Sequence, residues 1–389
     1  MTRPSLNVVV GVIAAAVLAG LGATVGCSSN AKKDQPPTMI PGASYGTVVV
    51  NPAPPEGSAP PPPAQDAKMP VPSLIAQQIT SVGDNYDARF SVDGTKALFT
   101  SRSRPSHRHA QIYELDLVRM LEKRLTFHDG DDGSPAYYEA DRYLYSSGTD
   151  EIKEEATAIE KLKRTYVGKP KDGRAKVSDT AADLYLQTYN GREIERLTNS
   201  LGFDGEADYD AKNKRIAFTS SRTGLAQVHL MSMPGRQVRR VSDVRSIDRM
   251  ARFSPDGSQL TWSRSSADGS SVQVLVADGD FSRPRVLTSG PYLHLQPTWH
   301  PGGQEVIFSA NRAGKFYNLY SIDREGKCLK RLTTAEFDQT SPAFSPDGKY
   351  LLFTGRRNGQ SHLYIIGYQP PADCMPEEPK PETPPAGGN

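Results

Sequence analysis

The chain has 389 residues, of which 37% are hydrophobic and 23% are charged, and its formal net charge at pH 7 is +2. This composition is typical of an ordinary globular protein and excludes a chain that is disordered throughout. The near balance of charge excludes the strong basic field with which nucleic-acid-binding proteins attract phosphate. The 31 prolines are unevenly placed, with a dozen between Pro36 and Pro72 and another cluster from Pro370 to Pro385, which predicts an extended segment at each end.

Residues 1–26 have the pattern of an export signal. Arg3 supplies a basic start, residues 8–25 form an apolar run without a charge, and Gly26 and Cys27 follow. The arrangement resembles a bacterial lipoprotein signal, which implies that Cys27 becomes the lipidated first residue of the mature chain. Thr24 departs from the leucine usual in that pattern. Two alternatives stay open, a cleaved signal without lipid and a retained membrane span, and all three export the protein.

Residues 27–73 are predicted to be a proline-rich tether, because they lack the apolar content needed to offset ordering entropy. At roughly 3.1 Å per residue in polyproline form, the tether reaches up to about 140 Å from a membrane. We expect the protein on the periplasmic side of the cell envelope. Ser28, directly after the cysteine, favours the outer membrane over the inner one.

A pentapeptide repeat organises the rest of the chain. The sequence FSPDG occurs at residues 253–257 and 344–348, and degenerate copies begin at Phe90, Tyr137, Tyr209 and Trp299. An apolar strand follows each copy, then a second strand, then a short strand that ends in Leu-Thr or a near equivalent. Those ends recur about every 45 residues, apart from one longer spacing. Four short strands in 45 residues form one blade of a β-propeller, and Pro, Asp and Gly in FSPDG predict the turn between the innermost strand and the next.

The two ends of the repeat region are predicted to complete each other. The last repeat lacks a fourth strand because residue 369 runs into Pro370, whereas residues 74–80 look like a fourth strand without a blade. Unpaired sheet edges are costly, so we expect residues 74–80 to pair with residues 362–366. The predicted fold is therefore all-β, a six-bladed propeller over residues 74–367 closed by an N-terminal strand. Residues 368–389 form a proline-rich tail.

The long spacing falls in the second blade, where about 27 extra residues precede residue 175. Ile152, Ala156, Ile159 and Leu162 recur at helical spacing, which predicts a helical insertion over about residues 150–175. The helix either covers the edge of the ring or contacts a partner.

Two cysteines, Cys328 and Cys374, remain after the signal. In an oxidising compartment an isolated pair either forms a disulfide, which here would pin the tail to the fold, or stays as two free thiols.

The blade sequences resemble the TolB-like propeller family. The residues that carry the resemblance are AFSPDGKYLLFT at residues 343–354, Leu363-Tyr364, and KRLT at residues 330–333, and it covers roughly residues 74–367. It implies a protein-binding scaffold that contacts a periplasmic or peptidoglycan-associated protein, without the N-terminal α/β domain of TolB. The same blades occur in peptidase and lyase relatives, so the fold does not fix the function.

No catalytic residues are predicted. A G-x-S-x-G motif at residues 42–46 lies in the tether rather than between a strand and a helix, and His107 and His109 are interpreted as parts of a solvated turn. The chain is therefore expected not to be an enzyme and to need no cofactor, except for calcium in the channel. The alternative is an enzyme acting on an envelope polymer or peptide with a metal at the mouth of the channel.

A charged rim is predicted where the chain crosses from the outer strand of one blade to the inner strand of the next. Its residues are interpreted either as pairs that staple the ring or as a rim for a cation or a partner protein. They are Asp84, Asp131, Asp132, Asp204, Asp248, His294 and Asp338, with Arg102, Arg104, Arg222, Arg264, Arg312, Arg356 and Arg357 in the turns after the second strands.

Overall fold

The computed structural model of the protein describes residues 75–139, 141–149 and 181–376, all within one compact unit. The predicted signal, Cys27, the tether, the helical insertion at about 150–175 and the tail beyond residue 376 lie outside the described residues. In the described ranges, no helix is long and apolar enough to cross a membrane.

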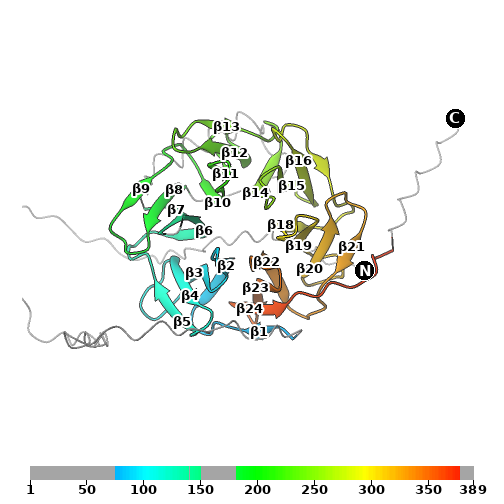
Figure 1. Cartoon of the computed structure of the whole chain (residues 1–389), viewed down its shortest axis with the longest axis horizontal. Coiled ribbons are helices and arrows are strands. Elements are labelled where there is room, and N and C mark those ends of the chain that lie inside the picture. Colours follow the sequence, from blue (N-terminus) through cyan, green and yellow to red (C-terminus); the bar gives the residue numbers. More distant parts are fainter. Residues whose placement is uncertain (1–74, 140, 150–180, 377–389) are drawn as a thin grey trace, which may run out of the picture. The chain divides into compact units, whose positions relative to one another are not determined.

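The described residues form six four-stranded antiparallel sheets arranged as blades around a ring, as predicted (Figure 1). The blades are numbered in chain order, each from its innermost strand outwards. Blade one contains β2 (Asp84–Phe90), β3 (Lys96–Arg102), β4 (Gln111–Asp116) and β5 (Leu121–Arg124). Blade two contains β6 (Asp132–Glu139), β7 (Arg142–Ser147), β8 (Asp183–Thr188) and β9 (Ile194–Arg196). Blade three contains β10 (Asp204–Asp210), β11 (Arg215–Ser220), β12 (Gln227–Ser232) and β13 (Val238–Arg240).

The second half of the ring repeats this order. Blade four contains β14 (Ile247–Phe253), β15 (Gln259–Ser265), β16 (Val272–Asp278) and β17 (Arg285–Val286). Blade five contains β18 (His294–Trp299), β19 (Glu305–Ala310), β20 (Asn318–Asp323) and β21 (Leu329–Arg331). Blade six contains β22 (Asp338–Phe344), β23 (Tyr350–Arg357) and β24 (Gln360–Gly367), with β1 (Gln77–Gln78) as its outermost strand.

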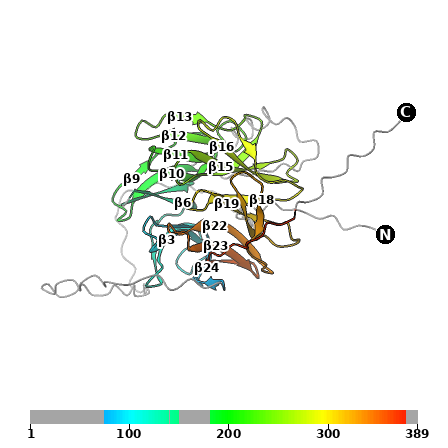
Figure 2. The same cartoon turned by 45° about the vertical axis from the view of Figure 1, so that its right-hand side comes forward.

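The predicted closure is confirmed. Gln77 pairs with Ile365 and Gln78 with Tyr364, so β1 and β24 lie side by side in one sheet (Figures 1 and 2). The hydroxyl of Thr80 accepts a hydrogen bond of 2.9 Å from the amide of Leu363, which extends the pairing past the end of β1. The first described strand therefore supplies the edge that the last blade lacks.

The Leu-Thr ending of each sequence repeat has the same structural role in all six blades. In every blade the hydroxyl at that position accepts a hydrogen bond of 2.9 to 3.0 Å from an amide of the third strand, at the point where the fourth strand ends. A buried amide without an acceptor is costly, so this side chain completes the ladder where the backbone no longer does. The six residues are Thr80, Thr126, Thr198, Ser242, Thr288 and Thr333.

The FSPDG turns join the first and second strands, as the sequence predicts. Ser254 donates to Asp256 over 2.6 Å, Asp256 also accepts from the amide of Ser258 over 3.0 Å, and Gly257 adopts a φ of 72°. These hydrogen bonds hold the pKa of Asp256 down at about 2. The turn is a structural device at the end of the blade opposite the predicted rim.

The core lies between the blades. Phe99 and Leu115 of blade one pack with Leu352 and Leu363 of blade six in one buried cluster. Strands covered on both faces by neighbouring sheets need apolar residues at successive positions, which accounts for continuous runs such as Tyr350 to Phe353.

Each innermost strand carries a β-bulge that the sequence analysis did not predict. In all six blades the register shifts within the first strand, and one residue of the bulge has a left-handed backbone with φ between 50 and 59°. A non-glycine residue rarely adopts this conformation, so the surrounding blade must hold it there. The six residues are Asp87, Ser134, Glu206, Met250, Gln296 and Ser341.

A disulfide joins Cys328, in the turn between β20 and β21, to Cys374. The amide of Met375 donates to the carbonyl of Leu329 over 2.6 Å, and its side chain packs on the core of blade five. Residues 374–375 are thereby fixed on blade five.

Candidate functional site

The predicted rim contains two successive positions of the first strand rather than one. Asp132, Asp204, Asp248 and His294 lie two residues before the left-handed residue of their strands, whereas Asp84, Asp131 and Asp338 lie three residues before it. Neighbouring residues of a strand point to opposite sides, so the two groups have different surroundings. The sequence analysis did not separate these two positions of the predicted rim.

We call the position two residues before the left-handed residue the anchor position. It is buried in every blade, with at most 2% of the residue exposed. Four of the six anchors contact an arginine from the second strand or from the turn after it. The contacts are Arg104 to Asn85 at 3.0 Å, Arg222 to Asp204 at 2.9 Å, Arg264 to Asp248 at 2.7 Å and Arg312 to His294 at 3.0 Å.

Burial shifts the pKa of two of these anchors, Asp204 and His294. Burial raises the pKa of Asp204, and the nearby guanidinium of Arg222 opposes the shift. Burial lowers the pKa of His294 to about 4, so the imidazole is neutral at physiological pH and its Nε2 can accept from Arg312. The sixth anchor, Gln339, is bonded to Thr333 and contacts no arginine among the described residues.

The other three predicted acids connect neighbouring blades. Asp84 accepts from the amide of Ser361 over 2.8 Å, Asp131 from the amide of Ala110 over 2.7 Å, and Asp338 from the amide of Tyr317 over 3.1 Å. In each case the acceptor lies at the start of one blade and the donor belongs to the blade before it. These carboxylates therefore hold adjacent blades together.

Two of the predicted rim arginines, Arg102 and Arg356, lie opposite these acids in the strand register and differ in their contacts. Arg102 forms an ion pair of 2.9 Å with Asp84. Arg356 lies opposite Asp338 in the strand register, but its side chain is exposed and no ion pair joins the two in the part of the chain that the structure describes. Arg356 therefore offers a free charge on the rim.

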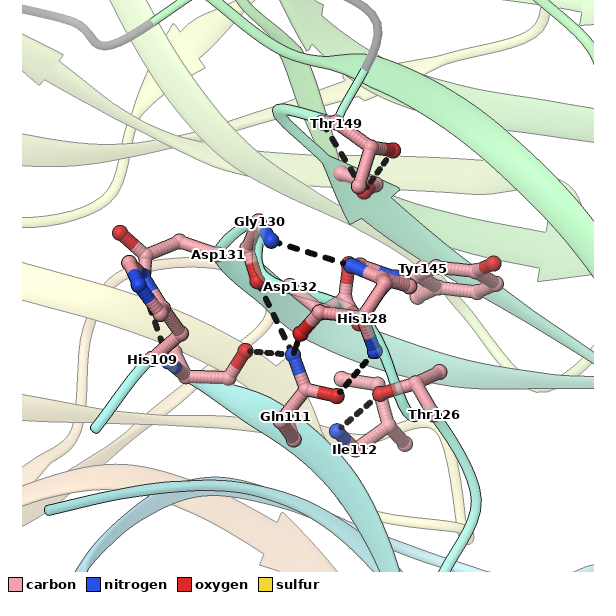
Figure 3. Close-up of polar contacts among 12 residues, drawn as sticks. His109, Gln111, Ile112, Thr126, His128, Gly130, Asp131, Asp132, Tyr145 and Thr149 are labelled. Atoms are coloured by element: carbon pink, nitrogen blue, oxygen red, sulfur yellow. Dashed lines mark hydrogen bonds and ion pairs between the residues drawn. The ribbon is translucent and has the colours of Figure 1, made fainter. Parts of the chain in front are cut away.

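Blade two is the one blade in which an aspartate anchor contacts no arginine among the described residues. Its anchor, Asp132, has a side chain that is 0% exposed, and its nearest cation is Nε2 of His128 at 3.0 Å (Figure 3). Neither carboxylate oxygen makes a fully aligned hydrogen bond among the described residues, and the contact with His128 is an ion pair. The neighbouring carboxylate raises the pKa of His128. Sequence reasoning missed His128, whose only signal was its position four residues before an aspartate.

A network around His128 fixes the loop that carries it (Figure 3). The side-chain amide of Gln111 donates to the carbonyl of His128 over 3.1 Å and to that of Gly130 over 2.9 Å. On the outside of the loop, His109 lies 3.6 Å from Asp131, and both side chains are about half exposed. The loop is thus rigid, while the imidazole of His128 keeps a 33% exposed edge.

The innermost strands carry further charges that the sequence analysis did not single out. Glu206 forms an ion pair of 2.9 Å with Arg249 and accepts from the amide of Met250 over 3.2 Å. Burial raises the pKa of Asp208 to about 6, although attraction to Arg89 opposes the shift. These residues lie within or beside the unpredicted bulges, so no simple pattern in the sequence marks them.

No group of three or more His, Cys, Asp or Glu side chains that could hold a metal ion is found in residues 75–139, 141–149 and 181–376. His107 bonds to the hydroxyl of Tyr113 over 2.8 Å and to the carbonyl of His109 over 2.7 Å. The G-x-S-x-G motif at residues 42–46 lies outside the described residues.

The comparisons with known proteins agree with the fold. The family model of the TolB β-propeller domain matches residues 174–315 and 252–371. A TolB homologue of Chlorobium luteolum is 32% identical over 206 residues, which are 53% of this chain and 42% of that protein. The chain thus matches about two fifths of the length of this relative, and it matches the same share, 42%, of a TolB homologue of Chlorobium chlorochromatii.

Two solved structures share the architecture. TolB of Acinetobacter baumannii has a TM-score of 0.54 and 20% identity, over 73% of this chain and 65% of that one. A puromycin-hydrolysing peptidase of Mycobacterium tuberculosis has a TM-score of 0.50 and 13% identity, over 76% of this chain and 46% of that one. At these identities the likeness shows the fold alone. From the family match and the six closed blades together, the chain belongs to the TolB β-propeller family.

Proposed function

We propose that the propeller is a protein-binding scaffold of the cell envelope, held there by a lipid on Cys27, and that its partner is a periplasmic or peptidoglycan-associated protein. Family membership is the observation that carries the proposal, since the matched relatives are TolB homologues. The lipid anchor, the outer membrane and the identity of the partner are parts of this proposal, as are the tether at residues 27–73 and the tail from residue 368.

The rim has the properties that a docking surface needs. Its anchors are buried and its acids bridge neighbouring blades, so the strand ends at this mouth form a rigid frame. Exposed charged side chains such as Arg356 and Asp131 stand on that frame. Rigid charged surfaces give specificity and fast association more than raw affinity.

Site-specific photocrosslinking in intact envelopes tests the proposal. Arg356 lies near the end of β23 and Lys349 lies directly before its start, and both are exposed, so they form a matched pair of labelling sites in one blade. We expect a crosslinker at Arg356 to capture an envelope protein and one at Lys349 to capture none. Equal capture from both sites, or capture from neither, contradicts a docking surface at the rim.

Two further measurements test the finer parts. Metabolic labelling with a fatty acid should label the chain, and Cys27→Ser should abolish the label. Elemental analysis of the purified chain separates the scaffold from the alternative enzyme, because a stoichiometric transition metal favours the enzyme.

A further inference from the structure

The repeated blades provide an internal template for what each anchor binds. In blades three and four the buried anchors Asp204 and Asp248 both hold a guanidinium, from Arg222 and Arg264 respectively, at 2.9 and 2.7 Å. Arginine matches a carboxylate in geometry and stays charged at every physiological pH. The space beside an aspartate anchor is therefore a guanidinium subsite, which these blades fill from within.

Blade two has the carboxylate but not the arginine. Asp132 is paired with Ser147 in the strand register as Asp204 is paired with Ser220. Thr149, two residues after Ser147, is therefore the counterpart of Arg222. Its hydroxyl bonds to Ser147 over 2.8 Å rather than to the anchor. No arginine or lysine in the described part of the chain makes an ion pair with Asp132.

His128, which occupies the subsite in blade two, is a weaker partner for the Asp132 carboxylate than an arginine would be. His128 approaches Asp132 to 3.0 Å as an ion pair rather than a well-aligned hydrogen bond, and neither buried carboxylate oxygen has another partner among the described residues. An ionised carboxylate removed from water without hydrogen bonds is costly, and a better donor in that place would lower the free energy. The imidazole is 33% exposed, and its Nδ1 accepts from the amide of Gly130 over 3.2 Å, so the ring turns outwards about a rigid loop once that hydrogen bond is broken.

We propose that the blade-two subsite, formed by Asp132, His128 and Thr149, is the docking point for an arginine side chain of a protein partner, which displaces the imidazole. Phe127, next to His128 in the chain, is 72% exposed and gives the partner an aromatic contact beside the subsite. The inference rests on the proposed function only in assigning the arginine to a protein. The subsite itself follows from the comparison of the blades.

Binding should depend on pH because the proton on His128 competes with the incoming guanidinium. The charged groups that face this imidazole are Asp132 and Asp129, which favour its protonated form, and Arg124, which opposes it. When His128 is protonated it neutralises Asp132, and when it is neutral the carboxylate is left without a charge partner. We expect affinity for arginine to rise as the pH rises from about 5.5 to about 8.

The test uses N-acetyl-arginine amide as the probe and the uncharged N-acetyl-citrulline amide as its matched control. Binding to the full chain is followed by NMR, through the ring signals of His128 and the strand amides of blade two. We expect the arginine probe to shift these signals and to bind at least about tenfold more tightly than the citrulline probe. Equal binding of the two probes, or no shift with either, overturns the inference.

Three variants sharpen the result. Asp132→Asn should abolish the binding of the arginine probe, whereas Asp129→Asn, which removes the same charge from an exposed neighbour, should keep it. Thr149→Arg should recreate the pair of blade three, block the probe and raise the melting temperature, and it gives an answer even where Asp132→Asn does not fold. A Thr149→Arg chain that still binds the probe as tightly as the original counts against the subsite. If crosslinking at Arg356 succeeds while the probe fails, this inference falls and the proposed function stands.

Discussion

Replacement of Thr80 by valine tests how the ring is closed. The Thr80 hydroxyl accepts from the amide of Leu363 over 2.9 Å and from the side chain of Asn85 over 3.2 Å, and only 4% of Thr80 is exposed. Asn85 keeps a second bond, to the carbonyl of Val82 at 3.0 Å, but the amide of Leu363 loses its acceptor. A buried donor left without a partner costs about 1–3 kcal/mol. We expect the free energy of unfolding to fall by about that amount.

Thr100→Val is the matched control, because Thr100 is also fully buried and its hydroxyl has no hydrogen-bond partner among the described residues. That replacement removes no bond and should be neutral or slightly stabilising. Urea unfolding gives both free energies, and hydrogen exchange should show faster opening of β24 in the Thr80 variant alone. If Thr80→Val costs no more than Thr100→Val, the closing hydroxyl does not hold the last blade and the reasoning is wrong.

Three other predictions concern pairs and links within the ring. Arg264→Met leaves the buried carboxylate of Asp248 unpaired and should lower the free energy of unfolding, measured with urea, by about 3–5 kcal/mol. Arg142→Met breaks a pair with Glu193, which is 70% exposed, and should lower it by less than about 1 kcal/mol. Similar losses in both variants contradict the role of burial. Since burial lowers the pKa of His294 to about 4, its contribution to stability is present above about pH 6.5 and is lost as the pH falls towards 4, by up to about 3 kcal/mol. The difference in unfolding free energy between the original chain and His294→Gln should therefore shrink on acidification, and a constant difference refutes the assignment. Cys374→Ser removes the disulfide to Cys328, which spans 46 residues, and should lower the free energy of unfolding by about 4 kcal/mol relative to the oxidised chain, because the unfolded chain gains loop entropy. An unchanged urea midpoint means that the disulfide constrains the unfolded chain little.

The fold was predictable from the sequence because its signals are periodic. One turn motif and one Leu-Thr ending recur with nearly constant spacing, and each does the same physical task in every blade. The closure followed from counting, since one repeat lacked a strand and residues 74–80 had no blade. In the structure, the pairing of Gln78 with Tyr364 confirms that count.

The rim was predictable only as a region. The left-handed residues of the bulges include Asp87, Met250 and Gln296, so no residue type marks them. A bulge moves the side chains on one part of a strand by one position, and the sequence therefore did not separate the anchors from the acids beside them. The contact between His128 and Asp132 was missed for another reason. His128 can be recognised as the substitute for an arginine only after the structure shows the anchor–arginine contacts of the other blades.

The pairing of β1 with β24 also sets the order of events in folding. Gln78 and Tyr364 are 286 residues apart, and their side chains are hydrogen-bonded across the closing sheet. Contacts over such a separation form late, since the loop entropy between them is lost before the contact contributes stability. Five blades can assemble from local hairpins as the polypeptide emerges, but the sixth waits for both of its contributors. A chain stopped before residue 360 should thus leave β1 without its partner β24, as an unpaired strand open to pairing with another molecule.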